Sequence, residues 1–112
     1  MVKHKTKQLD AVFRALSDPT RRSMLRLLAG RERSIGELAA PFQMSFAGAS
    51  KHVRALEGAG LVTRTITGRT HVCRLEPAPL AAVDEWLHFY EGFWTHRLDD
   101  LEHELKKPHQ LP

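Results

Sequence analysis

The chain has 112 residues and a single cysteine, Cys73. One cysteine cannot form an internal disulfide or supply a Cys-pair zinc site, and it is more typical of an inert buried side chain. No run of about eighteen apolar residues is present, so a transmembrane helix is not expected. The polar, basic N-terminus lacks the apolar segment of a secretory signal. These absences predict a cytoplasmic protein in reducing surroundings, without membrane contact.

The sequence also lacks the motifs of common enzyme classes. It contains no Gly-rich loop that would hold a phosphate and no nucleophile elbow. Its Ser, His and Asp residues show no arrangement that suggests an activated nucleophile. The sequence therefore predicts no enzymatic activity, no catalytic residues and no cofactor.

Charge is unevenly distributed along the chain, whose net charge is +4. Residues 1–76 contain 14 Lys or Arg and 6 Asp or Glu, whereas residues 77–112 contain 3 and 7. A basic first part and an acidic last part indicate that the first part binds nucleic acid, here double-stranded DNA. Charge that merely keeps the protein soluble is the simpler alternative.

Helical spacing and capping residues predict three helices in the first part. Apolar residues from Leu9 to Leu16 predict a helix over residues 8–16. Asp18, followed by Pro19, is typical of a helix start, and Ser34 with Glu37 three residues later is typical of a capping box.

A chain of 112 residues is expected to form a single domain. Its expected parts are a loose basic arm at 1–7, a winged-helix core at 8–76, a dimerisation helix at 77–107 and a disordered tail at 108–112.

Residues 45–58 predict a recognition helix, capped by Ser45 and ended by Gly58 and Gly60. Ala49, Val53 and Leu56 share one face and are expected to pack inward. The small, hydroxyl and cationic residues that remain are expected to face a DNA major groove. The candidates on this helix are Phe46, Ala47, Gly48, Ser50, Lys51, His52 and Arg54. Ordinary solvated charges remain the alternative for the two cations, and a half-buried, backbone-bonded imidazole for His52.

A β-hairpin follows, with strands expected at 61–66 and 70–75 around the turn Thr67-Gly68-Arg69. Arg64, Arg69 and Thr70 are its candidate DNA contacts, because a cation at a hairpin tip can enter a minor groove or bind phosphate. Arg22, in the second helix, is a further candidate for phosphate. Either it or its neighbour Arg21 could instead pair with Glu37 or Glu57. The fold class is therefore mainly α with a small β-hairpin wing, a winged helix-turn-helix.

The last helix carries a continuous apolar stripe, and five of the eight aromatic residues of the chain lie between positions 86 and 94. A small domain has little core left to cover such a helix, so the stripe predicts burial against a second copy of the chain. Simple core packing is the alternative. The interface residues expected here are Leu80, Val83, Leu87, Tyr90, Trp94, Leu98 and Leu101.

Three segments together resemble the arsenic-repressor (ArsR/SmtB-like) family of bacterial winged-helix regulators: ALSDPTRRSMLRLLAG, SIGELAAPFQMSFAGASKHVRALEGAGLV and TRTITGRTHVCRL. The resemblance covers about residues 9–75, and the last helix looks like that of a metal-free branch. It implies a homodimer joined by the first and last helices, with Leu9 and Phe13 at the interface. It also implies a repressor that binds a pseudo-palindromic operator.

The metal-binding motifs of the family are not matched. The third-helix stretch is GELAAPF, without cysteine, and Asp84 is followed two residues later by Trp86 instead of His. His96, Asp100 and His103 share one face of the last helix and could hold zinc or nickel, although a solvated polar face is the simpler interpretation. Two alternatives therefore stay open, a metal-responsive repressor and a protein-interaction module. A small-molecule effector is also left open.

Overall fold

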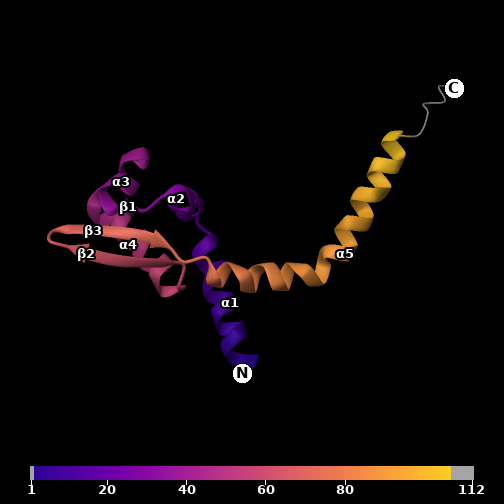
Figure 1. Cartoon of the computed structure of the whole chain (residues 1–112), viewed down its shortest axis with the longest axis horizontal. Helices are drawn as coiled ribbons and strands as arrows, with labels where there is room; N and C mark the ends of the chain where they lie inside the picture. Colours follow the sequence, from indigo (N-terminus) through magenta and orange to yellow (C-terminus); the bar gives the residue numbers. More distant parts are fainter. Residues whose placement is uncertain (1, 107–112) are drawn as a thin grey trace.

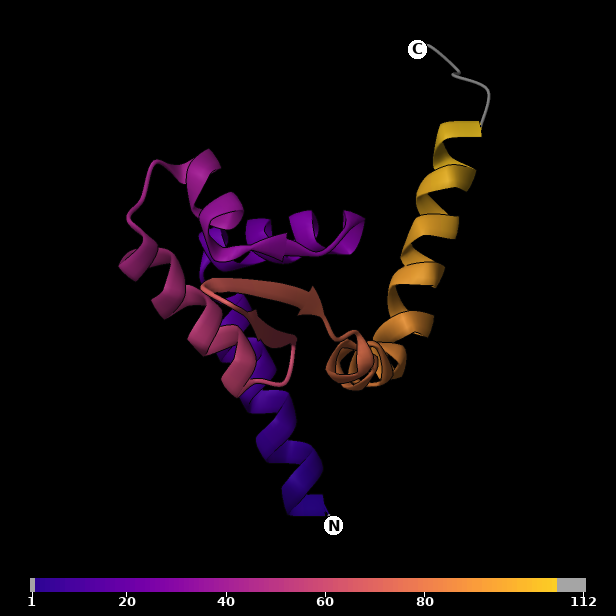
Figure 2. The same ribbon diagram turned by 60° about the vertical axis from the view of Figure 1, so that its left-hand side comes forward.

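The computed structural model describes residues 2–106, as five α-helices, a short 3-10 helix and three strands (Figures 1 and 2). Their bounds in chain order are α1 Val2–Leu16, α2 Pro19–Gly30, β1 Arg33–Ser34, α3 Ile35–Ala39, η1 Ala40–Phe42, α4 Phe46–Gly58, β2 Val62–Thr67, β3 Thr70–Leu75 and α5 Ala78–Lys106. This order confirms the predicted winged helix-turn-helix. The predicted tail and position 107 lie outside the described residues.

The predicted helix starts are confirmed by their hydrogen bonds. Asp18 accepts from the backbone amides of Thr20 (2.8 Å) and Arg21 (3.1 Å). Burial raises the pKa of Asp18, but these amide bonds, with smaller contributions from the side chains of His52 and Arg21, hold the pKa below its usual value. At α3, the Ser34 hydroxyl accepts from the Glu37 amide while the Glu37 carboxylate accepts from the Ser34 amide, which completes the capping box.

The hydrophobic core lies where α1, α2, α3 and α4 meet the sheet. Its largest fully buried side chains come from every one of these elements: Met24, Ile35, Leu38, Leu56, Leu61, Val12, Val53 and Cys73. Each such apolar side chain contributes about 1.5–3 kcal/mol by leaving water. The Cys73 thiol is free and buried, and burial raises its pKa, so it is the inert side chain that the sequence predicted.

The sheet contains one strand that the sequence did not predict. No strand was predicted before the hairpin, but Arg33 and Ser34 form β1 and pair with Cys73 and Val72 of β3. The strand order is β1-β3-β2, antiparallel throughout. A two-residue strand has no detectable period of its own, so only its partner defines it.

The first helix is longer than predicted. Residues 1–7 were expected to form a loose arm, but α1 begins at Val2, so residues 2–7 are its first turns. These turns carry Lys3, Lys5 and Lys7, which are good helix formers, and the apolar period that locates an amphipathic helix begins only at Leu9.

The last helix leaves the core and bends part-way along its length (Figure 1). Its first turns pack against the winged core through Pro79, Leu80 and Val83, and Trp86 meets the Phe13 ring of α1. The molecule is consequently elongated, with extents of 70 × 39 × 20 Å. Among residues 2–106, no helix is both long enough and apolar enough to cross a membrane.

Candidate nucleic-acid interface

The recognition helix α4 is fixed by its cap and by its inner face. The Ser45 hydroxyl accepts from the Gly48 amide at 3.0 Å. A Cβ added at Gly48 would come within 3.3 Å of that hydroxyl oxygen, so a small residue suits this position. Ala49, Val53 and Leu56 are fully buried, as the sequence predicted. The orientation of the outer face follows from this packing.

The outer face of α4 presents an aromatic ring, small residues and two cations. Phe46 is 54% exposed, and Ala47, Lys51 and Arg54 are also exposed, whereas Gly48 is half-buried. Among the side chains of residues 6–106, neither Lys51 nor Arg54 has a partner in an ion pair or a side-chain hydrogen bond. Two unpaired cations on one exposed helix face can approach phosphates or base edges without first breaking a contact.

Ser50 was predicted to face outward, and this prediction is wrong. Only 6% of the surface of Ser50 is exposed. Ser50 directly follows buried Ala49 and stands one turn before buried Val53, so the inner face of α4 is wider than the three apolar positions suggested. The error has a plain cause, since a serine carries no apolar signal to mark it as buried.

His52 is half-buried at the edge of α4. Its Nδ1 atom is buried and has no hydrogen-bond partner among the described residues. The predicted alternative of a backbone-bonded imidazole is therefore not found at Nδ1.

The wing tip is a two-residue turn in which Gly68 adopts a φ of 63°. Thr67 pairs with Thr70 across the turn. A glycine with positive φ at the first central position is the pattern of a type II′ hairpin. Arg69 and Thr70 are exposed at this tip, and within the described chain Arg69 makes no ion pair. The hairpin thus holds a cation at its far end.

Arg64 was predicted as a DNA contact, but the structure engages it internally. Its side chain is 14% exposed, and Nη2 donates to the Glu57 carboxylate at 2.6 Å. A second nitrogen, Nη1, lies 3.2 Å from Nδ1 of His71. Arg64 therefore lies between α4 and the wing, not at the outer surface.

Arg21 and Arg22 pair with neither Glu37 nor Glu57. Arg21 donates through Nε to the Ala15 carbonyl at 2.6 Å, and Arg22 donates through Nη1 to the Leu16 carbonyl at 2.6 Å. Both arginines thereby bind the carbonyl end of α1, where a cation also complements the helix dipole. Arg22 remains exposed and keeps further N–H donors.

The predicted dimer surface falls into two parts. Leu80 and Val83 already pack against the core of their own chain. Farther along α5, Leu87, Tyr90 and Trp94 are 37–40% exposed, and Leu98 and Leu101 are 61% and 55% exposed. On α1, Phe13 is 40% exposed and meets Trp86 edge-on at 5.4 Å, while Leu9 is half-buried.

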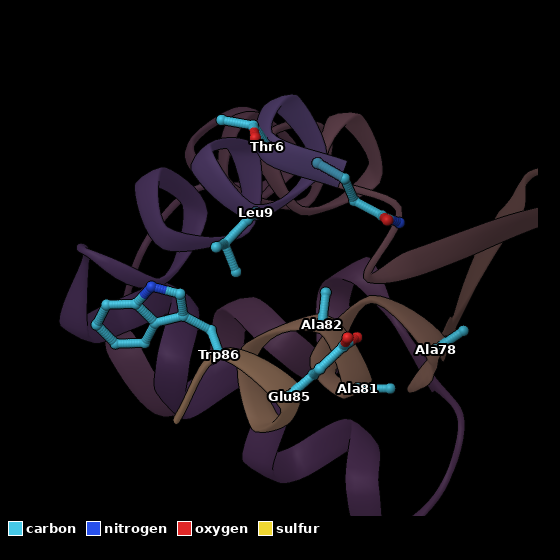
Figure 3. Close-up of a pocket in the computed structure, with 8 residues that line it drawn as sticks. Thr6, Leu9, Ala78, Ala81, Ala82, Glu85 and Trp86 are labelled. Carbon is cyan, nitrogen blue, oxygen red and sulfur yellow. The ribbon is translucent and has the colours of Figure 1, made fainter. Parts of the chain in front are cut away.

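A hollow of about 420 Å³ lies between α1 and the start of α5 (Figure 3). Leu9 and Trp86 form one side of it, and Ala78, Ala81 and Ala82 leave the space open because their side chains are small. The hollow and the exposed stripe are features of the same two helices. Together they form a partly apolar surface that the rest of the described residues do not cover.

Comparison with known proteins agrees with this geometry. A family model described as a helix-turn-helix domain matches residues 16–65. The HTH-type transcriptional regulator Rv2034 of Mycobacterium tuberculosis is 36% identical over 89 residues, covering 80% of each chain. The transcriptional repressor SdpR of Bacillus subtilis is 38% identical over 55 residues, covering 49% of this chain and 61% of SdpR.

Solved structures give the same result. A crystal structure of an ArsR family transcriptional regulator is 37% identical, with a TM-score of 0.74, covering 80% of this chain and 93% of that one. This chain belongs to the ArsR family of transcriptional regulators. An NMR structure of a homodimeric winged helix-turn-helix DNA-binding domain from Mycobacterium bovis is 25% identical, with a TM-score of 0.59, covering 96% and 90% of the two chains.

As an ArsR family member, the protein is a DNA-binding transcriptional regulator and not an enzyme. The metal candidates on its α5 do not form a site within one chain. His96 Nε2 and Asp100 lie 3.4 Å apart and are exposed. Over residues 6–106, whose side chains the structure describes, no group of three His, Cys, Asp or Glu side chains is placed to hold a metal ion, so His103 does not join the pair.

Proposed function

We propose that this ArsR family protein is a homodimeric repressor that binds a pseudo-palindromic operator through two copies of α4 and the wing. The observation that carries the proposal is the contrast among its cations. Lys51, Arg54 and Arg69 are exposed and unpaired among the described residues, whereas Arg21 and Arg33 are held by backbone carbonyls of their own chain. These three uncommitted cations lie on one helix face and one hairpin tip, the two parts expected to meet DNA.

The N-terminal half of α4 is the part expected to enter the major groove. Arg54 is suited to the guanine O6 and N7 pair, and Phe46 and Ala47 to thymine methyl groups. Arg69 and Thr70 are expected at the neighbouring minor groove or its phosphates. Arg22 is expected to bind phosphate with the N–H donors that the Leu16 carbonyl does not use.

Pairing of two chains is supported by the uncovered surface on α1 and α5. A soluble monomer rarely exposes a long row of large apolar side chains, and Leu98, Leu101 and Leu105 are each more than half exposed. A second copy would cover this row and set two recognition helices about one helical turn of DNA apart, roughly 34–36 Å. Repression, the activity in the name of SdpR, would follow if the bound dimer excludes RNA polymerase from a promoter. The expected location is the bacterial cytoplasm.

Selection of bound duplexes from random DNA tests the proposal. The expected product is a two-fold symmetric site whose half-sites are one helical turn apart. The variant Arg54→Ala should relax the selected sequence at one position of each half-site, with a loss of about 1–3 kcal/mol per contact. Lys106→Gln is the matched control, because it removes one positive charge at the far end of α5 (Figure 1). Recovery of unrelated sequences with no symmetry would refute operator recognition by a dimer.

Salt dependence provides a second test. With roughly six to ten phosphate contacts, affinity for the selected duplex should fall about 10³- to 10⁵-fold between 50 and 200 mM salt. A winged helix that serves only as a protein-interaction module would show no such dependence, and a flat salt response would favour that alternative.

A further inference from the structure

We propose that Arg64, Glu57 and His71 form a polar link that fixes the wing against the recognition helix, so that all three are positioning residues for the wing tip. The link joins β2, α4 and β3. The proposal rests on the proposed function, because it assumes that the wing tip and α4 bind the same duplex. It replaces the expectation that Arg64 itself touches DNA.

The link reaches both ends of α4. Glu57 is in the last turn of this helix and accepts from Arg64 Nη2 at 2.6 Å. Phe46 is the first residue of the helix, and its ring meets the His71 ring edge-on at 5.9 Å and 81°. The wing is therefore held at two points about three helical turns apart, which restricts tilting of the hairpin relative to the axis of α4.

The sheet register explains why one arginine can reach both partners. Arg64 is paired with Cys73 in the β2–β3 ladder. His71 lies two residues before Cys73 on the same strand face, so it is the diagonal neighbour of Arg64. The guanidinium fork spans this diagonal and still faces α4, which a single-point cation such as lysine could not do as well.

The chemistry of the contact defines the His71 tautomer. Arginine has only N–H donors, so Nδ1 of His71 must accept from Nη1 of Arg64, and the imidazole proton is on Nε2. The Nε atom of Arg64 is buried and has no partner among the described residues. An unsatisfied buried donor destabilises this arrangement. The guanidinium is therefore held by its bonds from Nη2 to Glu57 and from Nη1 to His71. An arginine held in this way is typical of a structural link, whereas an arginine that binds phosphate is mobile in the free protein.

The variant Glu57→Gln gives the sharpest test. If Glu57 is an ordinary acidic surface residue, the change should raise DNA affinity, whereas if Glu57 positions the wing, the change should lower it. Removing an acidic residue from a DNA-binding face strengthens binding through long-range electrostatics. If Glu57 instead holds the wing through Arg64, Glu57→Gln should weaken affinity for the selected duplex by about tenfold, the effect of losing one well-placed contact. Glu32→Gln is the matched control, since Glu32 is exposed and its side chain binds no other described residue. The affinity of this variant for the selected duplex should equal or exceed that of the wild type.

A double-mutant cycle separates positioning from direct contact. Arg64→Ala should weaken binding in the wild-type background, yet it should have little further effect once Arg69→Ala has removed the wing-tip contact. Both variants are measured well below their melting temperatures, so that a loss of folding is not mistaken for a loss of affinity. A full, additive effect of Arg64→Ala in the Arg69→Ala background, with a salt slope reduced by about 1 per protomer, would mean that Arg64 binds phosphate.

A DNA-free measurement keeps this proposal separable from the proposed function. Residual dipolar couplings of backbone N–H groups report the orientation of the wing relative to α4 in the free protein. In Glu57→Gln and Arg64→Ala, we expect the couplings of wing residues to shrink or to fit a new wing orientation, while the couplings of α4 stay as in the wild type. In Glu32→Gln, we expect all couplings to stay as in the wild type. Unchanged wing couplings would overturn the link even if DNA binds. Altered couplings in a protein that binds no DNA would refute the proposed function alone.

Discussion

The winged core buries its large apolar side chains within one chain, whereas helix α5 leaves most of its own exposed. In the core, eight large side chains are fully buried within one chain, and they come from helices and strands far apart in the sequence. Along the 29 residues of α5, only Pro79 is buried, although the helix carries five of the eight aromatic residues. The core therefore contains its own stabilising contacts, whereas α5 has apolar side chains with too little of the chain to pack against.

This difference assigns the two regions different sources of stability. Core contacts are intramolecular and independent of protein concentration. Contacts of the exposed α5 stripe would form only between chains, so their contribution would grow with concentration. The same division separates the predicted functions, because α4 and the wing carry the unpaired cations Lys51, Arg54 and Arg69, and α5 carries the acidic, aromatic surface.

Leu98→Asp should have the largest effect on DNA binding. A carboxylate in the centre of the apolar stripe would oppose pairing of two copies, and a single chain can bind only one half-site. Loss of the second half-site should reduce operator affinity roughly 10²- to 10⁴-fold, with the winged core still folded by circular dichroism. His103→Asp is the control, since it adds the same charge to the polar face of α5. Equal effects of the two variants would show that the stripe is not an interface.

Leu56→Ala should have the largest effect on the core itself. Leu56 is fully buried, so the truncation should lower the free energy of unfolding by about 2–5 kcal/mol. Urea denaturation at several protein concentrations measures this loss in the free energy of unfolding. The loss should be nearly independent of concentration, whereas the smaller loss in Leu98→Ala should depend on it. If both variants respond alike to concentration, the two regions are not stabilised differently.

Arg69→Ala should weaken binding to all duplexes alike, by about tenfold, because the wing-tip cation is expected to hold phosphate and not to read a base. The salt slope should fall by about 1 for each protomer. Fluorescence anisotropy with the selected site and with a scrambled duplex compares the two affinities. A loss confined to the selected site would mean that Arg69 reads sequence.

Glu37→Gln should have the smallest effect, a slight loss of stability near neutral pH that disappears on acidification. The Ser34 amide and the Arg31 guanidinium lower the pKa of Glu37 from 4.5 to about 2. Because the pKa is lower in the folded state, ionised Glu37 stabilises the fold above about pH 4.5, and this contribution is lost as the pH falls toward 2. Melting curves of the variant should therefore show a smaller loss on acidification than the wild type. An unchanged acid profile would contradict a stabilising role for this capping box.

The sequence was most informative where a local rule determines structure. The caps at Asp18 and Ser34, the turn at Gly68 and the inner face of α4 are confirmed because each depends on neighbours within a few residues. The errors concern positions that only the tertiary fold defines. Ser50 is buried although nothing in its own side chain marks it as a core residue, and Arg64 is engaged by residues seven positions away on either side. No local pattern distinguishes such an arginine from one that faces DNA.

Sedimentation velocity on the protein, alone and mixed with its selected duplex, tests the central claim most directly. The account predicts that the free protein sediments as two copies of the 12.7 kDa chain and that one duplex binds two chains together. Saturation of each duplex by a single chain, or a free protein that stays a monomer at concentrations well above those that saturate DNA, would contradict it.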